Sequence, residues 1–235
     1  MSTETAASVA CVTESTPDRS ISRRISRRVR VGEWIVDALF STPRQDDEVS
    51  LSRQAACLAE DLAATALGLD GDSVRLASVM PSGRPILLVD GVPGDVSVSM
   101  SHLQGLVGAG LCGKAWVGLD IVDPADAGRG LDAWFTPDEL SLLPDDLGLL
   151  RAMLWAAKEA AYKASHLDTE FRPRTVLICD LSMTGFSWVA HDRFADVRGA
   201  GCFMVIHRHV VAVAATVPRR SRSLLHTRFP ETFDS

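Results

Sequence analysis

The sequence LVGAGLCGKAWVGLDIVDP, residues 106–124, lies near the middle of the chain and decides how the fold is interpreted. Its glycines fit the dinucleotide-binding pattern G-x-G-x-x-G, and its Gly-Lys pair completes most of the phosphate-binding pattern G-x-x-x-x-G-K. Both patterns need a helix directly after the glycines, because the helix N-terminus supplies amide groups and a dipole that favour a phosphate. The structure expected after Gly113 therefore decides between a nucleotide site and a coincidental match.

The residues after Gly113 predict a strand. Apolar residues run from Trp116 to Val122 and are followed by Pro124, which is typical of a strand that enters a turn. Ala115 stands where the phosphate-binding pattern needs a magnesium-binding hydroxyl. We therefore expect two strands joined by a hairpin turn at Gly113 and Lys114. The alternative, a nucleotide-binding oxidoreductase or NTPase, lacks the required context.

Working outward, the hydrophobic pattern predicts an α+β protein, with strands before and after a helical middle. Thr136 followed by Pro137, with Glu139 three residues after Thr136, is typical of a capped helix start. We expect helices over residues 49–68, 136–143 and 147–165, and strands over residues 73–80, 83–91, 95–102, 106–112, 115–122, 174–181, 186–192, 201–207 and 209–217.

Composition narrows the class of protein. The net charge of −6 argues against a basic nucleic-acid-binding surface, and no apolar run is long enough to span a membrane. The five cysteines are odd in number and scattered, without a C-x-x-C pair, which is typical of reduced thiols. We therefore expect a cytoplasmic protein that binds neither nucleic acid nor membrane.

The two ends differ from the middle. Residues 1–28 have no hydrophobic period, and six arginines lie between Arg19 and Arg30 without an apolar export segment after them. The sequence allows either a disordered, solvated tail or a basic arm that meets a phosphate or an acidic partner. We expect residues 1–28 to be a disordered arginine-rich tail and residues 218–235 to be a loose C-terminal tail.

Three ionisable residues in the middle of the chain suggest chemistry. Asp120 lies inside an apolar strand, where a carboxylate needs a cation, an arginine or backbone donors as a partner. Trp155, Glu159 and Lys163 are spaced four residues apart, so they share one helical face. Taken alone, Asp120 is consistent with a structural salt bridge, and Glu159 with Lys163 is consistent with a helix-stabilising ion pair.

Taken together, these segments resemble a known family. The segments are GRP at 83–85, SVSMSH at 97–102, VGLDI at 117–121, FTPDE at 135–139 and LWAAKEAAYKA at 154–164. In this order and at these spacings the chain resembles the 4′-phosphopantetheinyl transferases of the Sfp type. The resemblance implies a pseudo-twofold pair of α/β halves, each an antiparallel-type sheet packed with helices, with coenzyme A in the cleft between them. We assign the halves to residues 29–122 and 123–217.

The resemblance also implies a reaction and its residues. The family moves phosphopantetheine from coenzyme A to a serine of an apo acyl or peptidyl carrier protein, with Mg²⁺, and we expect a monomer. Asp120 and Glu159 would bind the metal; Glu159 would also act as base, and Lys163 would reach the pyrophosphate or leaving group. Further expected contacts are Arg53, Arg84, Ser101, His102, Lys158 and Lys163 to coenzyme A, and Glu139 to the metal through a water.

Two of the chain's departures from the family pattern bear on whether it keeps the reaction. Relatives often carry a second acid two residues after the strand aspartate, where this chain has Val122, and continuation of the strand would point Asp123 to the opposite face. Relatives also have a glycine-rich turn after the lysine, where this chain reads SHLDTEFRPR, residues 165–174. These departures leave open the alternative of a diverged member that keeps the fold but has lost or changed the transfer reaction, as a binding or biosynthetic accessory protein.

Overall fold

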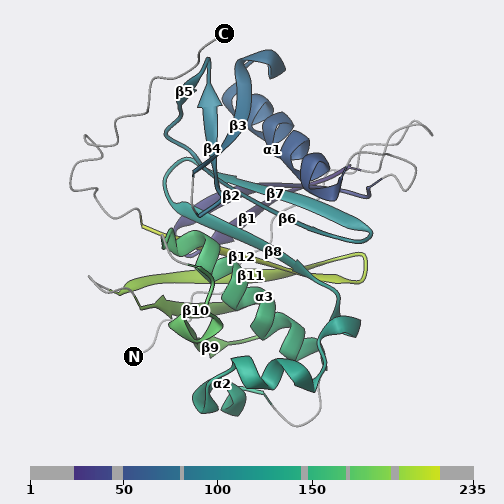
Figure 1. Ribbon diagram of the computed structural model, residues 1–235, viewed down its shortest axis with the longest axis vertical. Coiled ribbons are helices and arrows are strands. Elements are labelled where there is room, and N and C mark those ends of the chain that lie inside the picture. Colours follow the sequence, from purple (N-terminus) through teal and green to yellow (C-terminus); the bar gives the residue numbers. More distant parts are fainter. Residues whose placement is uncertain are drawn as a thin grey trace.

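The computed structural model describes residues 24–43, 50–79, 82–143, 148–167, 170–191 and 196–217. They form a mixed α+β structure with mainly antiparallel sheets, as the sequence predicted (Figure 1). The helices are α1 (Leu51–Leu67), α2 (Pro137–Ser141) and α3 (Gly148–Ser165), with short 3₁₀ helices η1 (Gly71–Ser73), η2 (Pro124–Asp126), η3 (Arg129–Trp134) and η4 (Pro173–Thr175).

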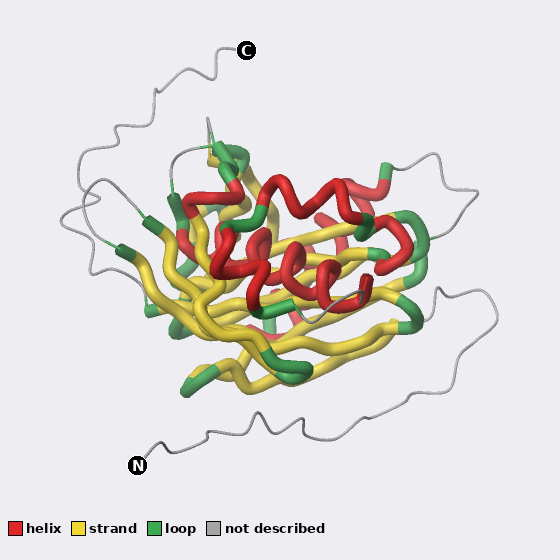
Figure 2. The backbone as a smooth tube through the Cα atoms, turned by 90° about the horizontal axis from the view of Figure 1, so that it is seen from below, coloured by secondary structure: helices red, strands yellow, loops and turns green. Residues whose placement is uncertain are grey.

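The strands form three sheets. They are β1 (Arg24–Val31), β2 (Trp34–Ser41), β3 (Val74–Val79), β4 (Arg84–Val89), β5 (Val92–Pro93), β6 (Ser97–Leu103), β7 (Leu106–Cys112), β8 (Trp116–Val122), β9 (Val176–Leu181), β10 (Gly185–Ala190), β11 (Val197–Ile206) and β12 (His209–Thr216). Their orders are β1-β2-β7-β6, β8-β12-β11-β10-β9 and β3-β4-β5. Figure 2 shows most of the helical backbone on one side of the strands.

The same order of elements occurs twice along the chain. A strand, a long helix, a hairpin and two further strands appear first as β2, α1, β3–β4, β6 and β7, and again as β8, α3, β9–β10, β11 and β12. In both halves the first strand pairs with the last, β2 with β7 and β8 with β12. The boundary that we expected after residue 122 is wrong, because β8 pairs with β12 and so belongs to the second half.

The turn after β7 is also not the hairpin that we expected. Strand β7 pairs with β2 and β6, whereas β8 pairs with β12, so Gly113 and Lys114 carry the chain from one sheet to the other. A strand follows the glycines, so neither nucleotide-binding pattern has the helix N-terminus that it requires. The glycines serve packing: a Cβ atom on Gly108 would lie 2.8 Å from ring carbons of Phe40.

The arginine-rich segment is partly a strand. We expected residues 24–28 to belong to a disordered tail, but β1 begins at Arg24 and pairs along its length with β2. Val29 and Val31 are buried in the core between the two larger sheets, while neighbouring arginines remain exposed. Arg28 pairs with Asp37 on β2 at 2.7 Å. The rest of the predicted tails, residues 1–23 and 218–235, lies outside the described residues.

Candidate functional site

The contact between α3 and β8 brings the predicted carboxylates together. A Cβ atom on Gly118 would overlap the carbonyl oxygen of Ala160, so only glycine lets the helix lie this close to the strand. Asp120 lies two residues along β8 and therefore points to the same face, toward α3. On α3, Glu159 and Lys163 lie one turn apart. The alanine-rich sequence of α3 and Gly118 thus place three charged side chains in one spot.

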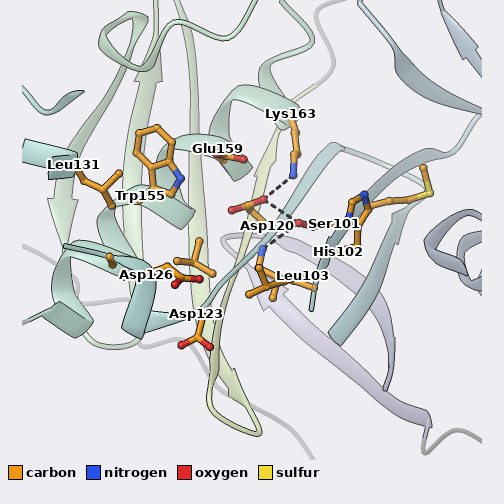
Figure 3. Close-up of a pocket in the computed structure, with 14 residues that line it drawn as sticks. Ser101, His102, Leu103, Asp120, Asp123, Asp126, Leu131, Trp155, Glu159 and Lys163 are labelled. Carbon is orange, nitrogen blue, oxygen red and sulfur yellow. Dashed lines mark hydrogen bonds and ion pairs between the residues drawn. The ribbon is translucent and has the colours of Figure 1, made fainter. Parts of the chain in front are cut away.

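Asp120 is the centre of this cluster (Figure 3). It is only 3% exposed, and its Oδ1 atom accepts hydrogen bonds from Lys163 Nζ at 2.7 Å and from Ser101 Oγ at 3.0 Å. Lys163 Nζ also donates to the Leu119 carbonyl at 3.0 Å. Both side-chain donors reach the same oxygen, and Figure 3 shows the second oxygen turned toward the side of Trp155.

Glu159 shares this environment and is difficult to ionise. Burial and repulsion by Asp120 raise the pKa of Glu159 from 4.5 to about 7, although Lys163 and a hydrogen bond with Trp155 oppose the shift. A hydrogen bond with Asp120 also favours the protonated form. The two carboxyl groups are therefore adjacent and incompletely neutralised, which is the electrostatic condition that a bound cation relieves.

The raised pKa of Glu159 predicts a pH dependence of stability. Between pH 4.5 and about 7 the folded protein holds a proton on Glu159 that the unfolded chain releases. The free energy of unfolding should therefore fall as the pH rises through this range in the absence of metal. Urea denaturation of the parent and of Glu159→Gln measures this, because the variant lacks the contribution. Parallel pH profiles of the two proteins would contradict the assignment.

A cavity of about 370 Å³ opens beside the cluster. Its walls come from both halves of the molecule, because β6 contributes one side and β8, α3 and the η2–η3 segment contribute the others. Asp120, Glu159, Lys163 and Trp155 all line it. The predicted catalytic and metal-binding carboxylates are therefore accessible from one cleft between the halves.

A second cavity, of about 300 Å³, adjoins the first. Met100, His102 and Lys163 line both cavities, so the two are neighbours on either side of these residues. Arg84, the first residue of β4, lines the second cavity together with the C-terminal end of α3. The structure thus places the predicted residues Arg84 and His102 beside the carboxylate cluster.

His166 also lines the second cavity and was not predicted from the sequence. It stands in the segment where relatives carry the glycine-rich turn, and its φ of 51° is a left-handed conformation that favours glycine. Its ring stacks on Trp116 at 4.3 Å, and burial together with Arg84 lowers the pKa of His166 to about 3. A neutral, stacked imidazole therefore forms part of the wall.

Two predicted site residues lie in the core instead. Lys158 and Glu139 are 0% and 1% exposed, and Lys158 Nζ donates to Glu139 Oε1 at 2.5 Å and to the Val176 carbonyl at 2.6 Å. Glu139 also accepts from the Ile178 amide at 2.9 Å and completes the predicted capping box with Thr136. Neither lines either cavity, so the expected metal contact of Glu139 and coenzyme contact of Lys158 are wrong.

Two further residues were expected to contact coenzyme A, Ser101 and Arg53. The Ser101 hydroxyl has one proton, which it donates to Asp120, and it accepts from the Ile121 amide at 3.2 Å. Ser101 also lines the first cavity, so its expected contact with coenzyme A stays a prediction. Arg53 is exposed on the first turn of α1 and does not line the second cavity, although its neighbour Ser52 does.

Asp123 differs from its expected orientation. The chain turns at Pro124 instead of continuing the strand, and Asp123 lines the first cavity while its Oδ1 atom caps η2 through the Ala125 amide at 3.0 Å. Its Oδ2 atom lies 3.1 Å from Arg208 Nε. Both oxygens are therefore engaged, and Asp123 does not join the Asp120–Glu159 pair in the place of the acid missing at Val122.

The carboxylate pair suits a small divalent cation only as part of a larger ligand set. Within the described ranges, no group of three or more His, Cys, Asp or Glu side chains is arranged to hold a metal ion. Asp120 and Glu159 still offer adjacent hard oxygens, and Mg²⁺ commonly takes one or two carboxylates with water and substrate phosphates as its other ligands. The residues present therefore fit a magnesium ion that also binds a phosphate substrate.

The comparisons with known proteins address the second half of the chain. In the part of the chain that the structure describes, no helix has the length and hydrophobicity to cross a membrane. The search of the curated proteins found no match. Residues 116–213, which include the carboxylate pair and Lys163, match the family model of the 4′-phosphopantetheinyl transferase superfamily.

Proposed function

We propose that this protein is a magnesium-dependent, Sfp-type 4′-phosphopantetheinyl transferase that moves phosphopantetheine from coenzyme A to a serine of an acyl or peptidyl carrier protein. The observation that carries the proposal is the cluster of Asp120, Glu159 and Lys163 in a cleft between the two halves. The match of residues 116–213 to the superfamily supports it. The second product would be adenosine 3′,5′-bisphosphate.

Asp120 and Glu159 would hold the metal, and Lys163 would act beside them. The bound Mg²⁺ would neutralise the pyrophosphate of coenzyme A. Lys163 is 29% exposed at its side chain and reaches both cavities, so its ammonium group can leave Asp120 for a phosphate oxygen. The ammonium group would then lie next to the negative charge that develops on the departing phosphate, which stabilises the transition state.

Proton transfer is assigned to Glu159. In the reaction the serine oxygen of the carrier forms a bond to the phosphorus of the phosphopantetheine phosphate, and the bridging P–O bond of the pyrophosphate breaks. The serine proton passes to Glu159 directly or through a water that Glu159 holds. The charge of a bound cation would favour the ionised form of Glu159, which is the form that can accept a proton.

The second cavity would hold the nucleotide end of coenzyme A. His102 lies where the two cavities meet and would contact the pyrophosphate. Arg84 lines the second cavity and not the first, and it would bind the 3′-phosphate, for which a planar guanidinium offers paired donors. The apolar and aromatic wall around His166 would enclose the rest of this end.

Arg84→Ala tests this orientation of the coenzyme. The variant should bind coenzyme A about tenfold or more weakly, since a charge-assisted hydrogen bond contributes roughly 1.5–3 kcal/mol. Its affinity for 3′-dephospho-coenzyme A should change much less, because that compound lacks the phosphate assigned to Arg84. Titration calorimetry with both ligands gives the comparison. Equal losses for both would remove Arg84 from this role.

One experiment tests the function itself. The protein is incubated with coenzyme A, Mg²⁺ and an apo carrier protein, and the carrier is weighed by mass spectrometry. We expect the mass of the carrier to increase by one phosphopantetheine group, and omission of Mg²⁺ or addition of a chelator should prevent the increase. Binding of coenzyme A without transfer to any of several acyl and peptidyl carriers would instead favour a diverged protein that has lost the reaction.

A further inference from the structure

A row of serine hydroxyls joins the two halves beside the site. Strands β6 and β8 lie side by side but belong to different sheets, so the outward amides of β8 have no neighbouring strand backbone in a ladder. Serines of β6 accept these amides instead. The bonds are Val117 N to Ser97 Oγ at 3.0 Å, Leu119 N to Ser99 Oγ at 2.9 Å and Ile121 N to Ser101 Oγ at 3.2 Å.

Ser101 differs from the other two serines in one contact. It is 9% exposed, and its hydroxyl proton is directed to Asp120 Oδ1 at 3.0 Å while its oxygen accepts the Ile121 amide. The hydroxyl is therefore held on both sides and cannot rotate without losing a bond. Because the Ile121 amide belongs to the residue after Asp120, the same serine fixes both the strand and the carboxylate (Figure 3).

The position of Lys163 adds to this restraint. Its Nζ atom donates to the same Asp120 oxygen at 2.7 Å, but from α3, whereas Ser101 reaches this oxygen from β6. Two donors share Oδ1, and the second oxygen, Oδ2, is turned toward the side of Trp155, which also lines the cavity. If Lys163 moves to a phosphate, Ser101 is the side chain that still holds Asp120 in this orientation.

We propose that Ser101 is a positioning residue that presents Asp120 Oδ2 to the metal. The hydrogen bonds between the β6 serines and the β8 amides, which we call the seam between the two halves, would then set the geometry of the metal site. This inference rests on the proposed function, since it assigns the metal to Asp120 and Glu159. Outer-sphere hydrogen bonds to a metal-binding carboxylate orient the ligand, and their loss typically lowers metal affinity by 10–100-fold. The other two serines of the seam, Ser97 and Ser99, have no such contact with Asp120, so their loss should affect only the contact between β6 and β8.

Ser101→Ala and Ser97→Ala form a matched pair for the test. Each variant leaves one β8 amide without its serine acceptor, and Ser101→Ala also removes the hydrogen bond to Asp120, so Ser101→Ala should lower the midpoint of thermal unfolding at least as much as Ser97→Ala. Only Ser101→Ala should weaken Mg²⁺ binding to the protein saturated with coenzyme A, by about tenfold in a calorimetric titration. Ser101→Thr keeps the hydroxyl and should recover most of the affinity.

The outcomes separate this inference from the proposed function. Mg²⁺ affinities that are equal in the parent, Ser97→Ala and Ser101→Ala would overturn the positioning role while the proposed function stands. Equal losses in both alanine variants would overturn it as well, because the seam alone would then explain the effect. A parent protein that binds no Mg²⁺ with coenzyme A would overturn both proposals. Selective loss in Ser101→Ala, with recovery in Ser101→Thr, supports the inference.

Discussion

Asp120→Asn and Glu159→Gln should each lower the rate of phosphopantetheine transfer by about 10³-fold, because a catalytic metal supplies several kcal/mol of charge stabilisation. Both substitutions keep the shape of the side chain and remove only its negative charge. Glu159→Gln also removes the proposed base. The measurement is the initial rate of mass gain of the carrier at saturating coenzyme A and Mg²⁺.

Controls for these variants exclude unfolding and general charge effects. Asp72→Asn removes a carboxylate whose side chain is 97% exposed, and its transfer rate should equal that of the parent. Glu159→Gln relieves the repulsion with Asp120 and should be at least as stable as the parent near neutral pH. Parental transfer by either site variant would show that the metal assignment is wrong.

Sequence patterns predict most of the helices and strands but less of how the strands pair. The strands that are expected from alternation and apolar runs are present, and Thr136 with Glu139 forms the expected cap of α2. The hairpin at Gly113 was wrong because consecutive strands usually pair, and the local sequence does not record that β8 is taken up by β12. Strand β1 was missed because arginines on its exposed face hide the alternation of Val29 and Val31.

The candidate site divides in the same way. Helical spacing alone places Glu159 and Lys163 on one face, and the strand position of Asp120 indicates a buried carboxylate that needs a partner. Their meeting depends on Gly118, whose importance appears only when α3 lies against β8. The role of Ser101 depends on which way one hydroxyl proton points, which spacing in the sequence does not specify.

Glu139 and Lys158 were assigned to the site because they lie in the FTPDE and LWAAKEAAYKA segments that carry the family resemblance, and charged residues are rarely fully buried. The exception is a pair that neutralises itself. Glu139 and Lys158 lie 19 residues apart along the chain, so helical spacing does not predict that they pair. The pair lies between α2, α3 and β9. A structural role for the two residues makes a prediction about stability that a catalytic role does not.

Lys158→Met should therefore destabilise the protein by about 3–5 kcal/mol, because it leaves the Glu139 carboxylate buried without its cation. Glu139→Gln keeps an acceptor for the Ile178 amide but should also be costly, since burial already lowers the pKa of Lys158 and the glutamate opposes that shift. The double variant removes both charges and should be more stable than Lys158→Met alone. Urea denaturation of the three variants completes a double-mutant cycle.

An exposed ion pair serves as the control for the buried pair. Arg24 and Asp61 also form a close contact, at 2.8 Å, but their side chains are about half exposed, so Arg24→Ala should cost no more than about 1 kcal/mol. If Lys158→Met costs no more than this exposed pair, or if the double variant loses the sum of both single effects, Glu139 and Lys158 do not act as a buried pair. A large loss of stability in Lys158→Met that the second substitution partly reverses would show that the buried pair is needed for folding, unlike an exposed ion pair. The folded fraction of these variants should keep its affinity for Mg²⁺ and coenzyme A, because neither residue lines the cavities.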